Sequence, residues 1–189
     1  RCCSLPMRAS RSRCRAREMA TPIAIRKLHH SAYRCRDSEA TRRFYEDFLG
    51  LPLACSHLIR ETKSGRPTEV LHTFYRLGDG SFIAFFEAHD LPFAFKPQHD
   101  FDLHLALEVD ASTLVAMHAK GIAEGIETRG ISMHGFIDSI YLRDPDGYVV
   151  ELCVKRPDHD RAMDPARNGA RALLDQWSAR RHATTDARP

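Results

Sequence analysis

Three side chains of types that bind transition metals occur at positions that favour one shared site. His30 and His104 each lie in a strand-like segment, and Glu151 lies in an apolar one. An unpaired carboxylate is unfavourable in such a segment, and two imidazoles with one carboxylate suit Fe(II), Mn(II), Ni(II) or Zn(II) while leaving coordination positions open. We therefore expect these side chains to converge on one divalent cation. His29 remains the alternative to His30, and a single strand histidine is more often a half-buried polar residue than a ligand.

Two similar runs of secondary structure must position these residues. A strand is expected from residue 23 to Asp37, which can cap a helix over 38–49, and Gly50 can end that helix. Three strands should follow, at about 51–60, 68–77 and 81–87. The order then repeats, with a strand at 102–109, a helix after Asp110, and strands near 126–129, 136–143 and 148–154.

The two runs correspond at their landmarks, which indicates an internal duplication. The segment DGSFIAFF at 79–86 parallels DGYVVELC at 146–153. A four-stranded sheet with one helix cannot close its own core, so each run needs its twin. The sequence therefore predicts an α+β fold of two βαβββ modules related by a pseudo-twofold axis, with a cleft between them. We place the domain at 22–155, with module one at 23–90 and module two at 100–155.

Both ends of the chain differ from this domain. Residues 1–18 hold six arginines and one acid without interleaved aromatic residues or an apolar face, which disfavours a nucleic-acid-binding or targeting role. We interpret residues 1–21 as a basic leader that is disordered or foreign to the natural protein, because Met19 begins a segment that reads like a natural start. Residues 156–189 are expected to form an amphipathic helix, which docks on the domain or on another subunit, and a tail.

The composition is that of an ordinary globular chain. Of its 189 residues, 43% are hydrophobic and 28% charged, with a formal net charge of +3. No run approaches the roughly 20 apolar residues of a membrane span, so we expect no membrane association. The six cysteines form no CxxC motif and no secretory signal is evident, which favours free thiols in a reducing cytoplasm. Nucleotide-binding and serine-hydrolase motifs are absent from the sequence.

The chain resembles the vicinal oxygen chelate superfamily, which includes glyoxalases, bleomycin resistance proteins, fosfomycin-resistance transferases and extradiol dioxygenases. The resemblance covers about residues 24–154 and rests on LHHSAYRCRDSEATRRFYEDFLGLPL and YLRDPDGYVVEL. It implies that His30, His104 and Glu151 bind a divalent metal, which chelates a small-molecule substrate through two adjacent oxygens. It also implies a homodimer.

Residues between His134 and Glu151 resemble the ring-cleavage signature of extradiol dioxygenases. The resemblance implies that Tyr141 and His134 steady an oxyanion or bound oxygen, although both could simply cap a hairpin. Ser132 departs from the signature, and the acid-base histidine expected near the last strand of module one is missing, so His72 is the candidate replacement. The favoured reaction is therefore an extradiol-type dioxygenation with Fe(II) or Mn(II), and Ni(II) and Zn(II) are the alternative metals.

Glyoxalase-type sites commonly use a fourth ligand at a position that mirrors Glu151. Glu151 follows Gly147 by four residues, whereas Ala84 follows Gly80 by four and cannot bind a metal. Glu87 should point to the opposite face of its strand. This vacancy favours a three-ligand site. The alternatives left open are a glyoxalase-like lyase, an isomerase or epimerase, a thiol transferase, and a metal-free module that binds a small aromatic compound or drug.

Overall fold

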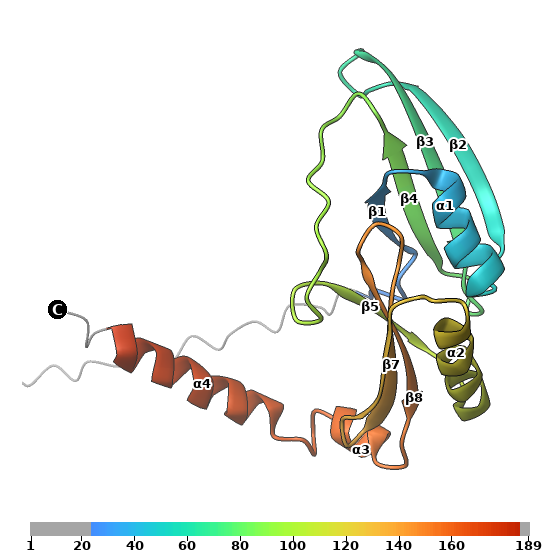
Figure 1. Cartoon of the computed structure of the whole chain (residues 1–189). Coiled ribbons are helices and arrows are strands. Elements are labelled where there is room, and N and C mark those ends of the chain that lie inside the picture. The colour runs from blue at the N-terminus through green and yellow to red at the C-terminus, as the bar shows by residue number, and fades with distance from the viewer. Residues whose placement is uncertain (1–23, 186–189) are drawn as a thin grey trace, which may run out of the picture.

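The computed structural model describes residues 24–185 and contains both expected βαβββ modules (Figure 1). The basic leader predicted at 1–21 lies outside the described residues. The elements of module one are β1 (His30–Cys35), α1 (Ser38–Arg42), a π-helical segment (Arg43–Phe48), β2 (Leu53–Glu61), β3 (Pro67–Arg76) and β4 (Phe82–Ala88). Those of module two are β5 (His104–Glu108), α2 (Ala111–Ala123), β6 (Thr128–Met133), β7 (Ile137–Arg143) and β8 (Val149–Lys155).

Each module forms its own four-stranded mixed sheet. The strand order is β1-β4-β3-β2 in the first sheet and β5-β8-β7-β6 in the second. In both sheets the first strand of the module pairs in parallel with the last, and the remaining pairs are antiparallel. The predicted α+β class and the internal duplication are therefore confirmed.

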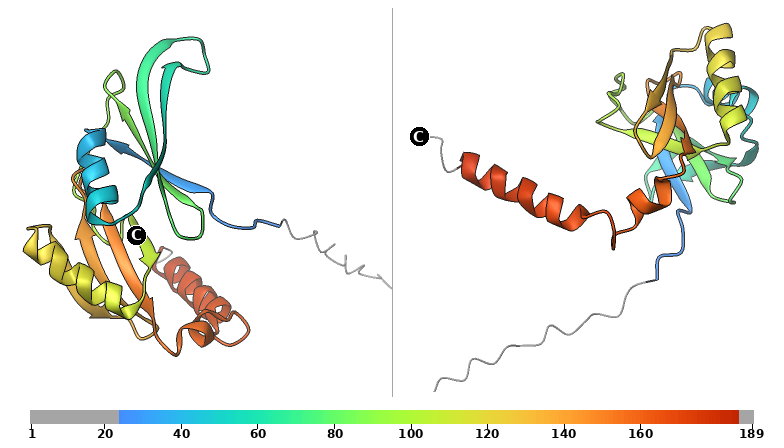
Figure 2. Two further views of the ribbon diagram at one scale, coloured as in Figure 1. Left: turned by 90° about the vertical axis from the view of Figure 1, so that its right-hand side faces the viewer. Right: turned by 90° about the horizontal axis from the view of Figure 1, so that it is seen from below.

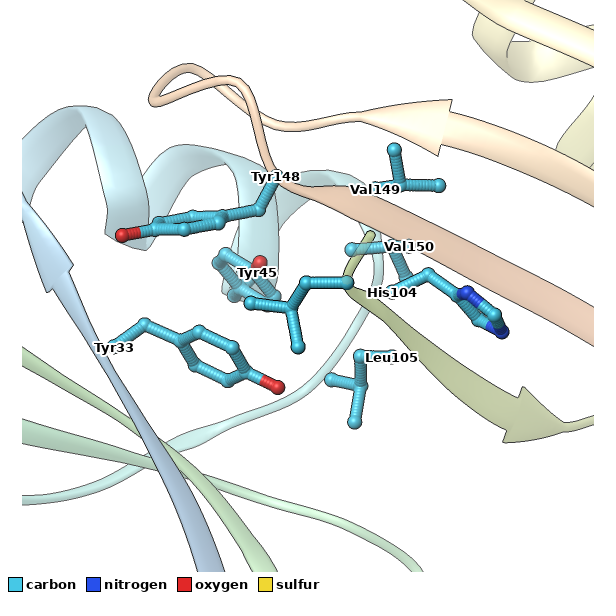
Figure 3. A pocket seen from close by; sticks show the side chains of 8 residues that line it. Tyr33, Tyr45, His104, Leu105, Tyr148, Val149 and Val150 are labelled. Carbon is cyan, nitrogen blue, oxygen red and sulfur yellow. The ribbon is translucent and has the colours of Figure 1, made fainter. Parts of the chain in front are cut away.

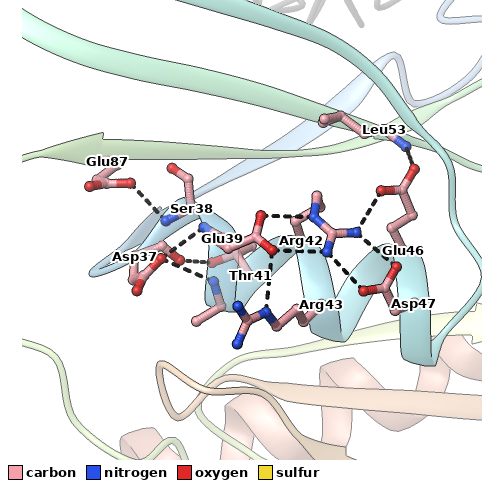
Figure 4. Close-up of polar contacts among 11 residues, drawn as sticks. Asp37, Ser38, Glu39, Thr41, Arg42, Arg43, Glu46, Asp47, Leu53 and Glu87 are labelled. Carbon is pink, nitrogen blue, oxygen red and sulfur yellow. Dashed lines mark hydrogen bonds and ion pairs between the residues drawn. The ribbon is translucent and has the colours of Figure 1, made fainter.

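Helix α1 begins where the sequence predicts, at the Asp37 cap. The Asp37 carboxylate accepts hydrogen bonds from the backbone N–H groups of Glu39 and Ala40, at 2.8 and 3.0 Å (Figure 4). These contacts satisfy two of the amide donors that a helix leaves free at its start. The expected single helix over 38–49 is not uniform, because residues 43–48 widen into a π-helical segment.

A network around one arginine then fixes the path from the helix into β2. The Arg42 guanidinium donates to the carboxylates of Glu39, Glu46 and Asp47 at 2.7–3.0 Å. Glu46 in turn accepts a hydrogen bond from the backbone N–H of Leu53 at 2.9 Å (Figure 4). The entry of β2 is thus tied to the helix that precedes it.

The helices pack against one side of each sheet, and the two modules share a core there. The core contains Cys35, Phe44, Tyr45, Phe48, Tyr75, Ile83, Phe85, Leu114, Ile140, Leu142, Tyr148, Val150 and Leu152. Polar contacts also join the modules: the Tyr45 hydroxyl donates to Asp144 Oδ2 at 3.1 Å, and the Lys120 ammonium donates to the Phe48 carbonyl at 2.7 Å. The opposite sides of the sheets are left uncovered by these helices.

We name these uncovered sides face A, on the first sheet, and face B, on the second. Alternation along the strands and the pairing registers assign residues to them. Face A carries His30, His72, Phe74, Phe82, Ala84 and Phe86. Face B carries His104, Ala106, Ser139, Tyr141 and Glu151.

Two further helices follow the domain, α3 (His159–Met163) and α4 (Ala170–Thr185). Helix α4 extends away from both sheets (Figures 1 and 2), and its Leu173, Leu174 and Trp177 side chains are exposed. The docking surface expected for this helix is therefore not provided by the described part of the same chain. None of the helices within residues 24–185 has the length and apolar character needed to cross a membrane.

Candidate functional site

Two of the three predicted metal ligands lie side by side on face B. His104 Nε2 is 3.2 Å from Glu151 Oε2. The Glu151 side chain is only 6% exposed, whereas His104 is 38% exposed and so reachable from solvent. A buried carboxylate in contact with one imidazole is an arrangement that a cation would stabilise.

Both side chains are oriented by a second contact. His104 Nδ1–H donates to the backbone carbonyl of Asp100 at 2.5 Å, which leaves the lone pair of the neutral ring on Nε2, the nitrogen beside Glu151. The Ser139 hydroxyl donates to the other Glu151 oxygen at 2.5 Å. Metal-binding histidines and carboxylates are typically held in this way by neighbouring groups. These two donors therefore fit a divalent cation.

Asp100 is itself held in place. Its carboxylate forms a close ion pair with Arg129, whose guanidinium lies 5.4 Å from the centre of the Tyr141 ring. The loop before β5 is thus tied to β6, on the edge of the second sheet. This contact fixes the carbonyl that orients His104.

Tyr141 and His134 form the second pair predicted from the sequence. The Tyr141 hydroxyl and His134 Nε2 are 2.8 Å apart, and Tyr141 is the register partner of Glu151 across β7 and β8. Burial and then the charge of Glu151 raise the pKa of Tyr141, so its phenol stays protonated at neutral pH. A protonated phenol beside a carboxylate ligand can donate a hydrogen bond to a bound substrate oxygen.

His30 lies on the other sheet. Its Nδ1 is 2.9 Å from Nδ1 of His29, and its ring packs edge-on against Phe74 with a centroid separation of 5.6 Å. Across residues 24–185, no three His, Cys, Asp or Glu side chains of one chain come together closely enough to hold a metal. One chain therefore brings together His104 and Glu151 but not the full predicted set.

His72 also belongs to face A. Its Nδ1–H donates to the Phe85 carbonyl at 2.9 Å, and its ring stacks on Phe86 at 3.7 Å. Burial is the main cause that lowers its pKa, with a further contribution from His30. His72 is thus neutral at physiological pH, and within one chain it stands with His30 rather than with the Tyr141 and His134 pair.

The register explains why the two modules are not equivalent as metal sites. Ala106 pairs with Glu151 in the second sheet, and Ala32 pairs with Ala84 at the equivalent place in the first. Glu87 does point the other way, since its carboxylate accepts a hydrogen bond from the Ser38 backbone N–H at 2.7 Å (Figure 4). Module one thus supplies a histidine without a carboxylate on face A.

Sequence reasoning missed Ser139, Asp100 and Arg129. Ser139 had a usable signal, because it lies two residues before Tyr141 and therefore on the same strand face. Asp100 acts through its backbone carbonyl, which no side-chain pattern reveals.

A small tyrosine-lined cavity of about 10 Å³ lies where β1 and β5 approach each other. Tyr33, Tyr45 and Tyr148 border it, and the His104 imidazole points away from these rings (Figure 3). The cavity is therefore part of the junction between the modules, and His104 serves face B.

The fold and the site together define a duplicated βαβββ protein with a histidine and carboxylate pair on one sheet. A model of the Glyoxalase/Bleomycin resistance protein/Dioxygenase superfamily matches residues 27–152, which include both modules. The chain belongs to this superfamily.

Solved structures support the same fold. A glyoxalase/dioxygenase from Nostoc punctiforme is 24% identical, with a TM-score of 0.53 over 72% of this chain and 97% of that one. The fosfomycin resistance protein FosX from Listeria monocytogenes, complexed with Mn(II) and 1S,2S-dihydroxypropylphosphonic acid, is 18% identical, with a TM-score of 0.54 over 72% and 98%. A glyoxalase family protein from Enterococcus faecalis is 24% identical, with a TM-score of 0.52 over 68% and 98%. A search of curated proteins found no match.

Proposed function

We propose that the protein is a divalent-metal enzyme with extradiol-type dioxygenase activity on a small substrate that offers two adjacent oxygens. The observation that carries this proposal is the oriented pair of His104 and Glu151, with the protonated Tyr141 phenol beside it. The Mn(II) bound by the structurally similar FosX supports a divalent metal on this fold. Fe(II) or Mn(II) is the favoured ion, with Ni(II) or Zn(II) as alternatives.

The third ligand, His30, would come from a second copy of the chain. A twofold contact is self-complementary, so placing face A of one copy against face B of the other forms the same set twice. Face A suits burial because Phe74, Phe82 and Phe86 remain only partly covered in one chain. The Nε2 atom of His30 also has no partner among the described residues, which leaves it available as a ligand.

The metal would supply Lewis acidity for the substrate oxygens. In this arrangement His104 and Glu151 hold the ion, while Asp100 and Ser139 keep these two side chains in position. Tyr141 would donate its phenolic proton toward a negatively charged substrate oxygen, and His134 would orient that phenol. His72, neutral and carried on face A of the second copy, would act as the base.

Metal content tests the site and its division between chains. His30→Ala, His104→Ala and Glu151→Ala should each abolish stoichiometric binding, whereas His118→Ala, an exposed change on α2, should not. Differently tagged H30A and E151A chains, co-expressed and purified as the mixed pair, should bind about one metal per pair instead of two, because one of the two sites is intact. A mixed pair without metal contradicts the shared site. A metal-free wild-type protein after loading with all four ions indicates a metal-free binding module.

The reaction is tested by oxygen uptake with a panel of catechols after anaerobic Fe(II) loading. Tyr141→Phe should lower kcat by about 10²- to 10³-fold, because a donor to the developing charge is lost. No uptake across the panel, together with lyase, isomerase or thiol-transfer activity supported by Mn(II) or Ni(II), would move the assignment to those reactions.

A further inference from the structure

A recess of about 290 Å³ lies beside β1, outside the metal-binding pair. Its lining includes the Arg34 side chain and the aromatic rings of Tyr33, Phe86, Phe93 and Tyr148. The volume is near the lower end of the range of about 300–1,000 Å³ that is usual for small-ligand sites. The recess is therefore large enough for a single-ring compound.

Arg34 brings a positive charge that the protein does not neutralise. Its Nη2 donates to the backbone carbonyls of Ala88 and Leu91 at 2.7 and 2.8 Å, and both acceptors are uncharged. The Nε–H group is buried without a hydrogen-bond partner, and Arg34 forms no ion pair with any described residue. The nearby Phe93 ring, 5.3 Å from the guanidinium carbon, offers only its π face. A half-buried guanidinium in this state favours an anion.

We propose that this recess binds a small aromatic carboxylate, with the carboxylate paired to Arg34 and the ring against the aromatic walls. The planar guanidinium matches a carboxylate in shape and charge, so an anionic ligand gives Arg34 the counter-charge that the chain lacks. A neutral ligand of the same size would leave that charge unpaired. The ring makes stacked or edge-on contacts of the kind that aromatic side chains favour.

Arg34 also tethers the segment after β4 through the Ala88 and Leu91 carbonyls. A purely structural role would make Arg34 important for stability without any ligand preference. The test must therefore measure a preference between ligands in addition to folding.

Benzoate and benzamide are suitable probes because they share a ring and differ in charge. Full-length protein kept metal-free with a chelator is titrated with each compound, and binding is followed by NMR shift changes, so the result is independent of the proposed metal chemistry. Benzoate should bind saturably and more tightly than benzamide. Arg34→Met should weaken benzoate binding by about 10- to 100-fold and abolish the preference. Arg60→Met, which removes an exposed arginine on β2, should change neither.

A second variant fills the recess without changing Arg34. Leu103 lines it and is 44% exposed, so Leu103→Trp should be tolerated and should block benzoate. It decides the question if Arg34→Met does not fold. The proposal is overturned if wild-type protein binds benzoate no better than benzamide, if Arg34→Met keeps the preference, or if Leu103→Trp binds benzoate as wild type does.

Discussion

Asp144, at the turn between β7 and β8, should make the folded protein less stable as the pH rises toward neutral. Its side chain is buried at the junction with Tyr45, and burial raises the pKa of Asp144 from 3.8 to about 6, with repulsion from Asp146 adding to the rise. A pKa higher in the folded state stabilises the fold below the unfolded pKa, and this stabilisation is lost as the pH rises through the folded pKa. At about 1.4 kcal/mol per pKa unit, the full loss is about 3 kcal/mol.

Asp144→Asn removes this titration and keeps an oxygen that can accept from the backbone N–H groups of Asp146 and Tyr148. Urea unfolding followed by circular dichroism gives the free energy of unfolding of both proteins. The stability of wild type relative to Asp144→Asn should fall by about 2–3 kcal/mol between pH 4 and pH 7. The control Asp175→Asn, on exposed α4, should show no such trend. A difference that stays constant with pH, or that grows in favour of wild type, would refute the reasoning.

Two other changes test the packing around the site. Ser139→Ala leaves an oxygen of buried Glu151 without its donor, so the metal-free protein should lose about 1.5–3 kcal/mol in urea unfolding, and metal affinity should fall by about 10- to 100-fold in calorimetry. Unchanged values in both assays would contradict the positioning role. Gly121→Ala would place a Cβ 2.3 Å from Thr128 Oγ1 and should destabilise the fold by about 1–3 kcal/mol, whereas Gly78→Ala meets nothing and should stay within about 0.5 kcal/mol. Equal midpoints for the two glycine variants would contradict the predicted clash.

The sequence was sufficient to predict the module fold and the equivalence of its landmarks. Side chains alternate along a strand with a period of two, so counting from Gly80 and Gly147 placed Ala84 and Glu151 at matching positions, as the register confirms. The same counting placed Glu87 on the opposite face. Periodicity thus fixed relations within each module.

The relation between the modules was not predictable in this way. The duplication says that each half has one helix-covered face and one uncovered face, but it does not say which uncovered faces meet. The packed junction depends on long-range contacts, such as Tyr45 with Asp144, that no local pattern encodes. The separation of His30 from Glu151 within one chain therefore became apparent only from the three-dimensional structure.

The separation of His30 from the other two donors has a consequence for how the protein responds to dilution. If each ion is gripped jointly by two polypeptides, occupancy and association are thermodynamically linked, and each strengthens the other. Lowering the protein concentration should then release the ion even when the buffer's free ion concentration is held constant. Conversely, adding the ion should drive monomers to pair, so that a cofactor would also govern assembly.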